Sequence, residues 1–122
     1  MVRVLILEDD PNRVADFRRN YSDFDLCFVS TVQEAEDVVK AQPAFDVMFL
    51  DHDLGGTQMA PSDKNSGYEF ARRLAIFHSS KLPKACVVHS LNPNGAENIV
   101  GAMGGNAIRI PFAWKQCVIK LT

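Results

Sequence analysis

The sequence predicts an α/β fold: a three-layer, doubly wound arrangement in which helices cover both faces of a five-stranded parallel sheet. Five short apolar stretches alternate with segments of helical periodicity along 122 residues, and such alternation is typical of parallel strands joined by right-handed crossovers. Residues 2–7 are apolar at nearly every position, as expected of a strand buried on both faces. The length fits one domain, residues 1–122, and we expect the strand order 2-1-3-4-5.

Helix boundaries follow from residues that cap helices. Asp10-Pro11 supplies an N-cap and then proline at the first helical position, Thr31-Val32-Gln33-Glu34 has capping-box spacing, and Gly104-Gly105 ends a helix. The expected strands are residues 2–7, 26–29, 47–50, 85–89 and 107–110. The expected helices are residues 11–20, 31–41, 68–78, 94–103 and 114–121, the last of which would also suit a strand at Cys117-Val118-Ile119. Residues 55–66 have no apolar period and are expected to form a loop.

Composition excludes several classes of protein. Thirteen basic and 15 acidic residues give a net charge of −2, so no basic field exists to form an extended nucleic-acid surface. The three cysteines are odd in number and widely spaced, which indicates reduced thiols and no zinc-type pairing. No stretch approaches the roughly 20 apolar residues of a membrane span. We therefore expect a cytoplasmic protein with no membrane association.

Acidic residues follow the first and third predicted strands. Glu8, Asp9 and Asp10 end the string LILEDD, and Asp51 and Asp53 lie in LDHD. In the expected strand order these two strands are neighbours at the switch point where open sheets bind ligands. Clustered carboxylates favour Mg²⁺ or Mn²⁺, with Asp9 and Asp51 as direct ligands, Glu8 holding a metal-bound water, and Asp53 contributing its carbonyl or side chain. Helix capping alone would explain Asp10 but not the second cluster.

Other polar residues close the third, fourth and fifth strands. Ser90 could donate a hydrogen bond to a phosphoryl oxygen, or simply form a turn. His52 and His89 could act as general base and general acid, although a lone histidine is more often structural. Arg109 is the cation best placed to hold a phosphate, and an outward-facing surface arginine is the alternative. Because side chains alternate along a strand, His89 and Ser90 should face opposite ways unless the strand ends between them.

The strings LILEDDPNR, FDVMFLD, VVHS and IPF together resemble a response-regulator receiver domain, of the CheY-like superfamily, across almost the whole chain. The resemblance places Glu8 and Asp9 at the acid pair, Asp51 at the phosphoacceptor aspartate and Ser90 at the family's hydroxyl. It implies that Asp51 accepts a phosphoryl group from a partner kinase with Mg²⁺ bound by the acids. Ile110, however, stands where that family has a lysine that contacts the phosphoryl group.

Three further departures point to one branch of that superfamily. Asp51 and Gly67 are 16 positions apart, roughly twice the spacing expected of an ordinary receiver. The strings LDHDLGG and HSLNPNGAENI are also foreign to ordinary receivers, and they resemble the divergent cyclic-phosphate-processing receiver domains. That resemblance implies metal-dependent hydrolysis of a cyclic phosphate, such as a 2′,3′-cyclic nucleotide or RNA end. Asn92 would orient this substrate and residues 55–66 would cover it.

Three functional hypotheses follow. The favoured one is a divalent-metal-dependent phosphoesterase in which Asp51, His52, His89 and Ser90 carry the chemistry, because Ile110 cannot read a new charge on a phosphoaspartate. The second is a single-domain response regulator that receives a phosphoryl group on Asp51 from a kinase. The third is a non-catalytic pseudo-receiver that binds a protein partner, since fold alone does not determine function.

Overall fold

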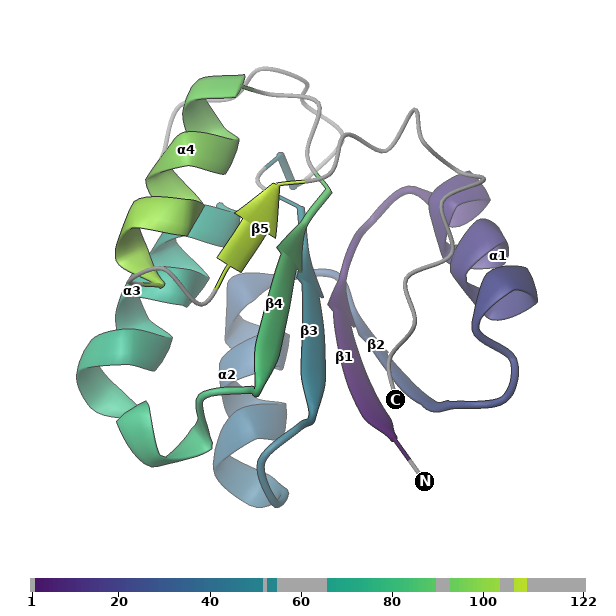
Figure 1. Ribbon diagram of the computed structural model, residues 1–122, viewed down its shortest axis with the longest axis horizontal. Helices are drawn as coiled ribbons and strands as arrows, with labels where there is room; N and C mark the ends of the chain where they lie inside the picture. Colours follow the sequence, from purple (N-terminus) through teal and green to yellow (C-terminus); the bar gives the residue numbers. More distant parts are fainter. Residues whose placement is uncertain (1, 52, 55–65, 90–92, 104–106, 110–122) are drawn as a thin grey trace.

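The computed structural model describes residues 2–51, 53–54, 66–89, 93–103 and 107–109. Its centre is a parallel sheet in the order β2-β1-β3-β4 (Figure 1), which confirms the predicted α/β class and the predicted order of these strands. A short fifth strand pairs with the outer edge of β4. The strands are β1 (Arg3–Leu7), β2 (Asp25–Val29), β3 (Val47–Leu50), β4 (Ala85–Val88) and β5 (Ala107–Arg109).

Four α-helices connect the strands in the described part of the chain. They are α1 (Pro11–Asn20), α2 (Val32–Ala41), α3 (Gly67–Phe77) and α4 (Pro93–Ala102), and a 3₁₀ turn, η1 (Ser79–Lys81), follows α3. Side-chain caps begin the first three helices. Asp10 accepts a hydrogen bond from the Asn12 N–H at 2.8 Å, and Thr31 accepts one from the Glu34 N–H at 3.1 Å. The predicted starts of α1 and α2 are therefore confirmed, since a capped N-terminus satisfies N–H groups that have no partner within the helix.

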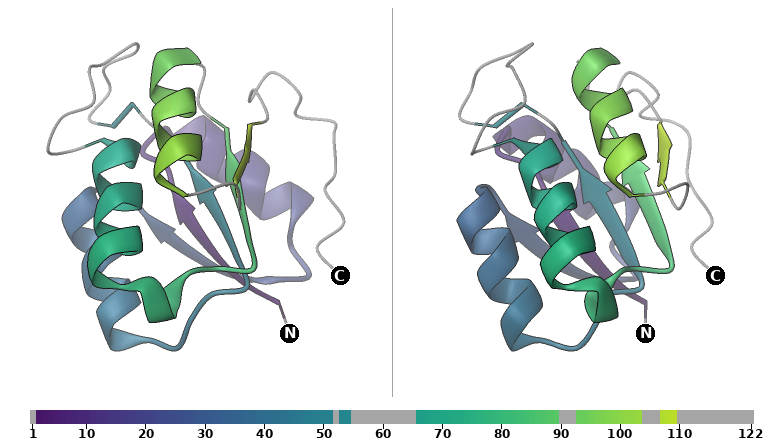
Figure 2. Two further views of the ribbon diagram at one scale, coloured as in Figure 1. Left: turned by 60° about the vertical axis from the view of Figure 1, so that its left-hand side comes forward. Right: turned by 90° about the vertical axis from the view of Figure 1, so that its left-hand side faces the viewer.

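The helices form layers on the two faces of the sheet, with α1 on one face and α2, α3 and α4 on the other (Figure 2). Side-chain alternation along each strand produces this division. In β1, for example, Leu5 and Leu7 belong to the core cluster that α2, α3 and α4 cover, whereas Val4 and Ile6 belong to the cluster that packs on Phe17 of α1. The sheet is thus buried on both faces, as its nearly continuous apolar strands predict.

One element in the described part of the chain was not predicted. The turn η1 was not expected from sequence, and its Lys81 donates a hydrogen bond at 3.1 Å to the carbonyl of Val39, near the end of α2.

Of the cysteines, Cys27 and Cys86 are free thiols. No helix among the described residues is long and apolar enough to cross a membrane. Several predicted segments lie outside the described residues: the loop at 55–65, the end of the fifth strand at 110, and the last helix at 114–121.

Candidate functional site

Strand register brings three ionisable residues side by side just beyond the carboxyl ends of β1, β3 and β4. Leu7 lies opposite Leu50, so the next step along both strands brings Glu8 opposite Asp51. The same step along β3 and β4 brings Asp51 opposite His89. Backbone hydrogen bonds continue the ladder to this level, from the Asp51 N–H to the Leu7 carbonyl at 3.0 Å and from the His89 N–H to the Leu50 carbonyl at 3.1 Å.

The three side chains also share one face of the sheet, the face covered by α1. Phe49 belongs to the cluster that packs on Phe17, and Asp51 lies two residues further along, which returns its side chain to the same face. His89 follows the same rule, and its ring lies 5.2 Å from the ring of Phe17, edge to face. Register and alternation together therefore converge Glu8, Asp51 and His89 from separate strands.

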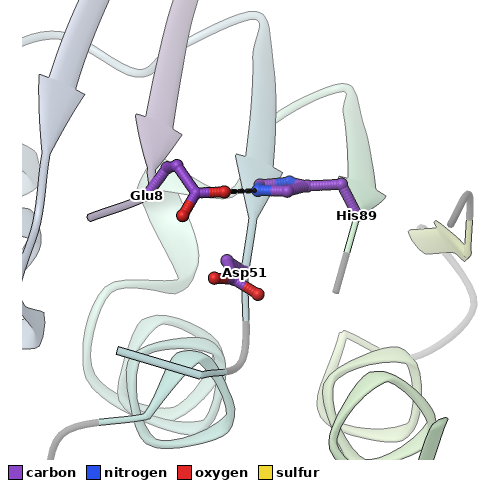
Figure 3. A group of neighbouring side chains, drawn as sticks. All are labelled: Glu8, Asp51 and His89. Atoms are coloured by element: carbon purple, nitrogen blue, oxygen red, sulfur yellow. Dashed lines mark hydrogen bonds and ion pairs between the residues drawn. The ribbon is translucent and has the colours of Figure 1, made fainter. Parts of the chain in front are cut away.

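The convergence is close and buried (Figure 3). Each residue offers one ligand atom such that all three atoms lie within 4.8 Å of one another, and each residue is at most 3% exposed. Nε2 of His89 lies 2.9 Å from Oε1 of Glu8, at hydrogen-bond distance. Charged and polar groups this deeply buried need partners, because removing them from water is costly.

Glu8 is held as a carboxylate by several donors. Its Oε2 accepts hydrogen bonds from the backbone N–H groups of Asp9 at 3.0 Å and Asp10 at 3.2 Å, just before α1 begins. Burial alone would raise the pKa of Glu8, but the hydrogen bond and charge of His89, the Asp10 N–H and the charge of Arg13 together bring the pKa below its ordinary value. Hydrogen bonds to the charged form of an acid act in this direction.

The pKa of Asp51 is shifted in the opposite direction to that of Glu8. Burial first, and then the negative charge of Glu8, raise the pKa of Asp51 from 3.8 to about 8, and the nearby Arg13 only partly offsets them. Its Oδ1 is buried, and no hydrogen-bond partner for it is found within the described ranges. An unsatisfied carboxylate oxygen beside a second carboxylate is the arrangement that a hard divalent cation relieves. The donor set therefore fits Mg²⁺ or Mn²⁺, with oxygens of Glu8 and Asp51 as ligands.

Arg13, which the sequence analysis did not single out, is a cation at this site. It lies in the first turn of α1, and its Nη1 is 3.5 Å from Oε1 of Glu8 and 3.6 Å from Oδ2 of Asp51. Its Nε is also 4.0 Å from the carboxylate of Asp10, the N-cap of the same helix. Its spacing of three residues from Asp10 could have indicated it, because residues three apart are neighbours on a helix surface and Asp10 belongs to the acidic run after β1.

The remaining predicted site residues are placed less closely or lie beyond the described part of the chain. Asp9 is half-buried and is not in the group with Asp51. Asp53 follows β3 and forms an isolated antiparallel bridge with Ser66. Arg109 ends β5. The residues that fall outside the described ranges are His52, Ser90 and Asn92.

Gly67 lies against the site from the helix side. It is the first residue of α3, and a Cβ added to it would lie 2.1 Å from the backbone carbonyl oxygen of Asp51 and 2.9 Å from Cδ1 of Ile99. No side chain fits at the first distance, so the residue must be glycine for α3 to begin where it does. The close approach packs the start of α3 directly against the backbone at the end of β3.

Comparison with known families gives one match over most of the chain. A family model described as "Cyclic-phosphate processing Receiver domain" matches residues 4–105. This range includes the whole Glu8–Asp51–His89 group. No curated protein sequence matches the chain.

Solved structures with the same fold include several bacterial receivers. The chain is similar to the response regulator TrrA from Thermotoga maritima, solved in complex with Mg²⁺ and BeF, at TM-score 0.69 and 15% identity over 95% of this chain and 92% of that one. It is also similar to a CheY-like receiver domain from Methylobacillus flagellatus, at TM-score 0.65 and 18% identity over 91% and 85% of the two chains. At these identities the similarity shows the fold alone.

Proposed function

Because this chain belongs to the family of cyclic-phosphate processing receiver domains, we propose that it is a divalent-metal-dependent phosphoesterase that opens a small cyclic phosphate. A 2′,3′-cyclic nucleotide or the cyclic end of an RNA would be its substrate. The observation that carries the proposal is the convergence of Glu8, Asp51 and His89 in a buried group with an unsatisfied Asp51 oxygen. A buried cluster of acids with a shifted pKa is typical of a catalytic site.

Glu8 and Asp51 would hold the ion, with Asp9 and Asp53 contributing from the adjacent loops. The support is geometric, since Glu8 and Asp51 lie at the same level of the sheet and their oxygens are within 4.8 Å of each other. Bound there, Mg²⁺ or Mn²⁺ would neutralise charge on the phosphodiester and make a water molecule acidic enough to attack phosphorus. The cation would also lower the pKa of Asp51, because it favours the ionised form.

The histidines would handle protons. Opening a cyclic diester adds water to phosphorus and breaks one P–O bond, so one proton leaves the water and one must reach the departing oxygen. His89 shares a hydrogen bond with Glu8, so this pair can retain a proton and hold the carboxylate in one orientation. His52 would be the second residue of the acid–base pair. Ser90, Asn92 and Arg109 would bind phosphoryl oxygens.

A panel of 2′,3′-cyclic nucleotides and cyclic-ended oligonucleotides, assayed with Mg²⁺ and with Mn²⁺, tests the proposal. We expect turnover by the wild type and a loss of about 100-fold or more in Asp51→Asn, His52→Ala and His89→Ala. Asp23→Asn makes the same chemical change at an exposed turn and should leave turnover unaltered. Absence of wild-type turnover across the panel would refute the proposal, as would equal turnover by all variants.

Phosphoacceptor activity is the second candidate, and the same Asp51 oxygen favours it. Oδ1 has no hydrogen-bond partner within the described ranges and lies at the end of β3, so it could attack a phosphoryl donor. Incubation with acetyl phosphate and Mg²⁺ followed by intact mass measurement separates the candidates. A long-lived gain of about 80 Da, one phosphoryl group, that disappears in Asp51→Asn supports signalling.

A wild type that Mg²⁺ does not stabilise at all would favour a pseudo-receiver that binds a protein partner instead.

A further inference from the structure

Arg13 lies between the buried acids and solvent. Its side chain is 16% exposed, whereas the side chains of Glu8 and Asp51 are 0% and 2% exposed. Arg13 is therefore a partly accessible group in contact with two acids that are not accessible. An anion that reaches the acids past α1 would meet this guanidinium.

Arg13 contacts the acids at distances that are long for a guanidinium, with one long hydrogen bond to Oε1 of Glu8. Nη1 is 3.5 Å from Glu8 and 3.6 Å from Asp51, beyond the roughly 2.7–2.9 Å of a strong charge-assisted hydrogen bond. Nη1 lies close to both acids and is not close-packed on either one. The geometry places a positive charge beside both acids without a short hydrogen bond from this nitrogen to either.

The charges of the site give this arrangement a second consequence. One guanidinium faces two acidic groups, and a divalent cation among the same oxygens would supply the positive charge that Arg13 now supplies. Arg13 and the ion would then repel each other, which weakens the hold of the acids on the guanidinium. A planar, permanently charged guanidinium at the mouth of a cationic centre is suited to a phosphoryl group, whose oxygens it can contact in pairs.

The IPF string supplies no cation, because Ile110 precedes Pro111. Arg13 reaches Glu8 and Asp51 from the first turn of α1.

We propose that Arg13 is a phosphate-binding cation of this site, and that it competes with the divalent ion for Glu8 and Asp51 when no phosphate is present. The proposal rests on the proposed function for its substrate class, since a phosphodiester is what the guanidinium would hold. It gives α1 a role in substrate binding, and none of the site residues predicted from sequence lies on this helix. Arg13 favours anionic ligands only after the acids have received their metal.

Two binding measurements on the whole chain test it, neither of which needs turnover. Isothermal titration with Mg²⁺ alone should show that Arg13→Gln binds the ion about tenfold more tightly than the wild type, because a competing positive charge is gone. Titration with inorganic phosphate at saturating Mg²⁺ should show about tenfold weaker binding by the same variant, because a charged contact is lost. A merely structural arginine would not move the two affinities in opposite directions.

Two further variants complete the design. Arg13→Lys keeps the charge but not the planar fork, so we expect wild-type Mg²⁺ affinity with weaker phosphate binding. Arg19→Gln removes the same charge from the exposed far end of α1 and should leave both affinities unchanged. Phosphate affinities of Arg13→Gln and Arg13→Lys within about twofold of the wild type would overturn the proposal, since such a difference is too small for a lost charge-assisted contact.

The outcomes separate this inference from the proposed function. A wild type that binds Mg²⁺ and phosphate as described, with the expected changes in the Arg13 variants, but that opens no cyclic phosphate would leave Arg13 as a phosphate-binding residue and refute the hydrolase. Turnover by the wild type with unaltered phosphate affinity in the Arg13 variants would support the hydrolase and refute the role of Arg13 in phosphate binding. A wild type that binds neither probe would refute both.

Discussion

Replacing Asp51 with asparagine should stabilise the metal-free protein at alkaline pH, which is the reverse of the usual effect of changing a buried residue. In the folded chain, burial and the charge of Glu8 raise the pKa of Asp51 from 3.8 to about 8. Between these two values the folded state holds a proton that the unfolded state releases. The free energy of unfolding therefore falls as pH rises through this window, and the contribution of Asp51 is fully lost above about pH 8.

The shift sets the size of the effect. About four pKa units at 1.36 kcal/mol each correspond to on the order of 5 kcal/mol between the acidic and alkaline ends of the window. This figure is an upper limit, because water entry and side-chain movement relieve part of the cost of a buried charge. We expect Asp51→Asn, which has nearly the same size and no charge, to exceed the wild type by a few kcal/mol above about pH 8, and to lose most of that advantage near pH 4.

Urea unfolding of both proteins with a metal chelator present, at several pH values from about 4 to 9, measures the difference directly. Asp23→Asn, an exposed carboxylate changed in the same way, should follow the wild type at every pH. Addition of Mg²⁺ should reverse the order at alkaline pH, since only the wild type keeps the ligand. A constant difference between Asp51→Asn and the wild type across the pH range would show that the burial of Asp51 does not perturb its ionisation.

Three other predictions concern the same fold. Gly67→Ala should destabilise the protein by about 3 kcal/mol, because the new Cβ meets the Asp51 carbonyl at 2.1 Å, whereas Gly101→Ala, with nothing within 4 Å, should stabilise it by about 0.5 kcal/mol in urea unfolding. Glu36→Gln should cost about 2 kcal/mol at neutral pH. Although burial raises the pKa of Glu36, its bonds to histidine and arginine lower it overall, so this cost should vanish as pH falls through that lowered pKa; equal cost in acid would contradict it. Mg²⁺ binding at pH 7 should release close to one proton from Asp51, measured by titration calorimetry in two buffers of different ionisation enthalpy, and no buffer dependence would be the contrary result.

Local signals in the sequence predicted most of the described fold. Asp10 and Thr31 mark helix starts through hydrogen bonds made within three residues, and such bonds depend on nothing distant. Apolar runs likewise place β3 at Val47–Leu50, as predicted. The turn η1 was missed because it is stabilised by Lys81 reaching the end of α2, a contact between segments about 40 residues apart.

The prediction from sequence, which does not use the alternation of side chains, has Asp9 and Asp51 as direct metal ligands and Glu8 as the holder of a metal-bound water. Counting in twos from Ile6 puts Glu8 on the same face as Asp51, and the structure groups Glu8 with Asp51 and His89. The same alternation places the side chain of His89 on the face of the sheet that α1 covers. The contacts of Arg13 could not be predicted from alternation alone, because they depend on where the first turn of α1 lies relative to two strands.

The backbone bridge between Asp53 and Ser66 has a consequence for how this protein could diversify. The bridge brings the two ends of the intervening segment together next to Asp51, and Gly67 then fixes the following helix against the sheet. Changes of length between these ends cost little, because the free energy of closing a loop grows only slowly with its length. The segment between Asp53 and Ser66 can therefore change in length over evolution while Glu8 and Asp51 keep their geometry.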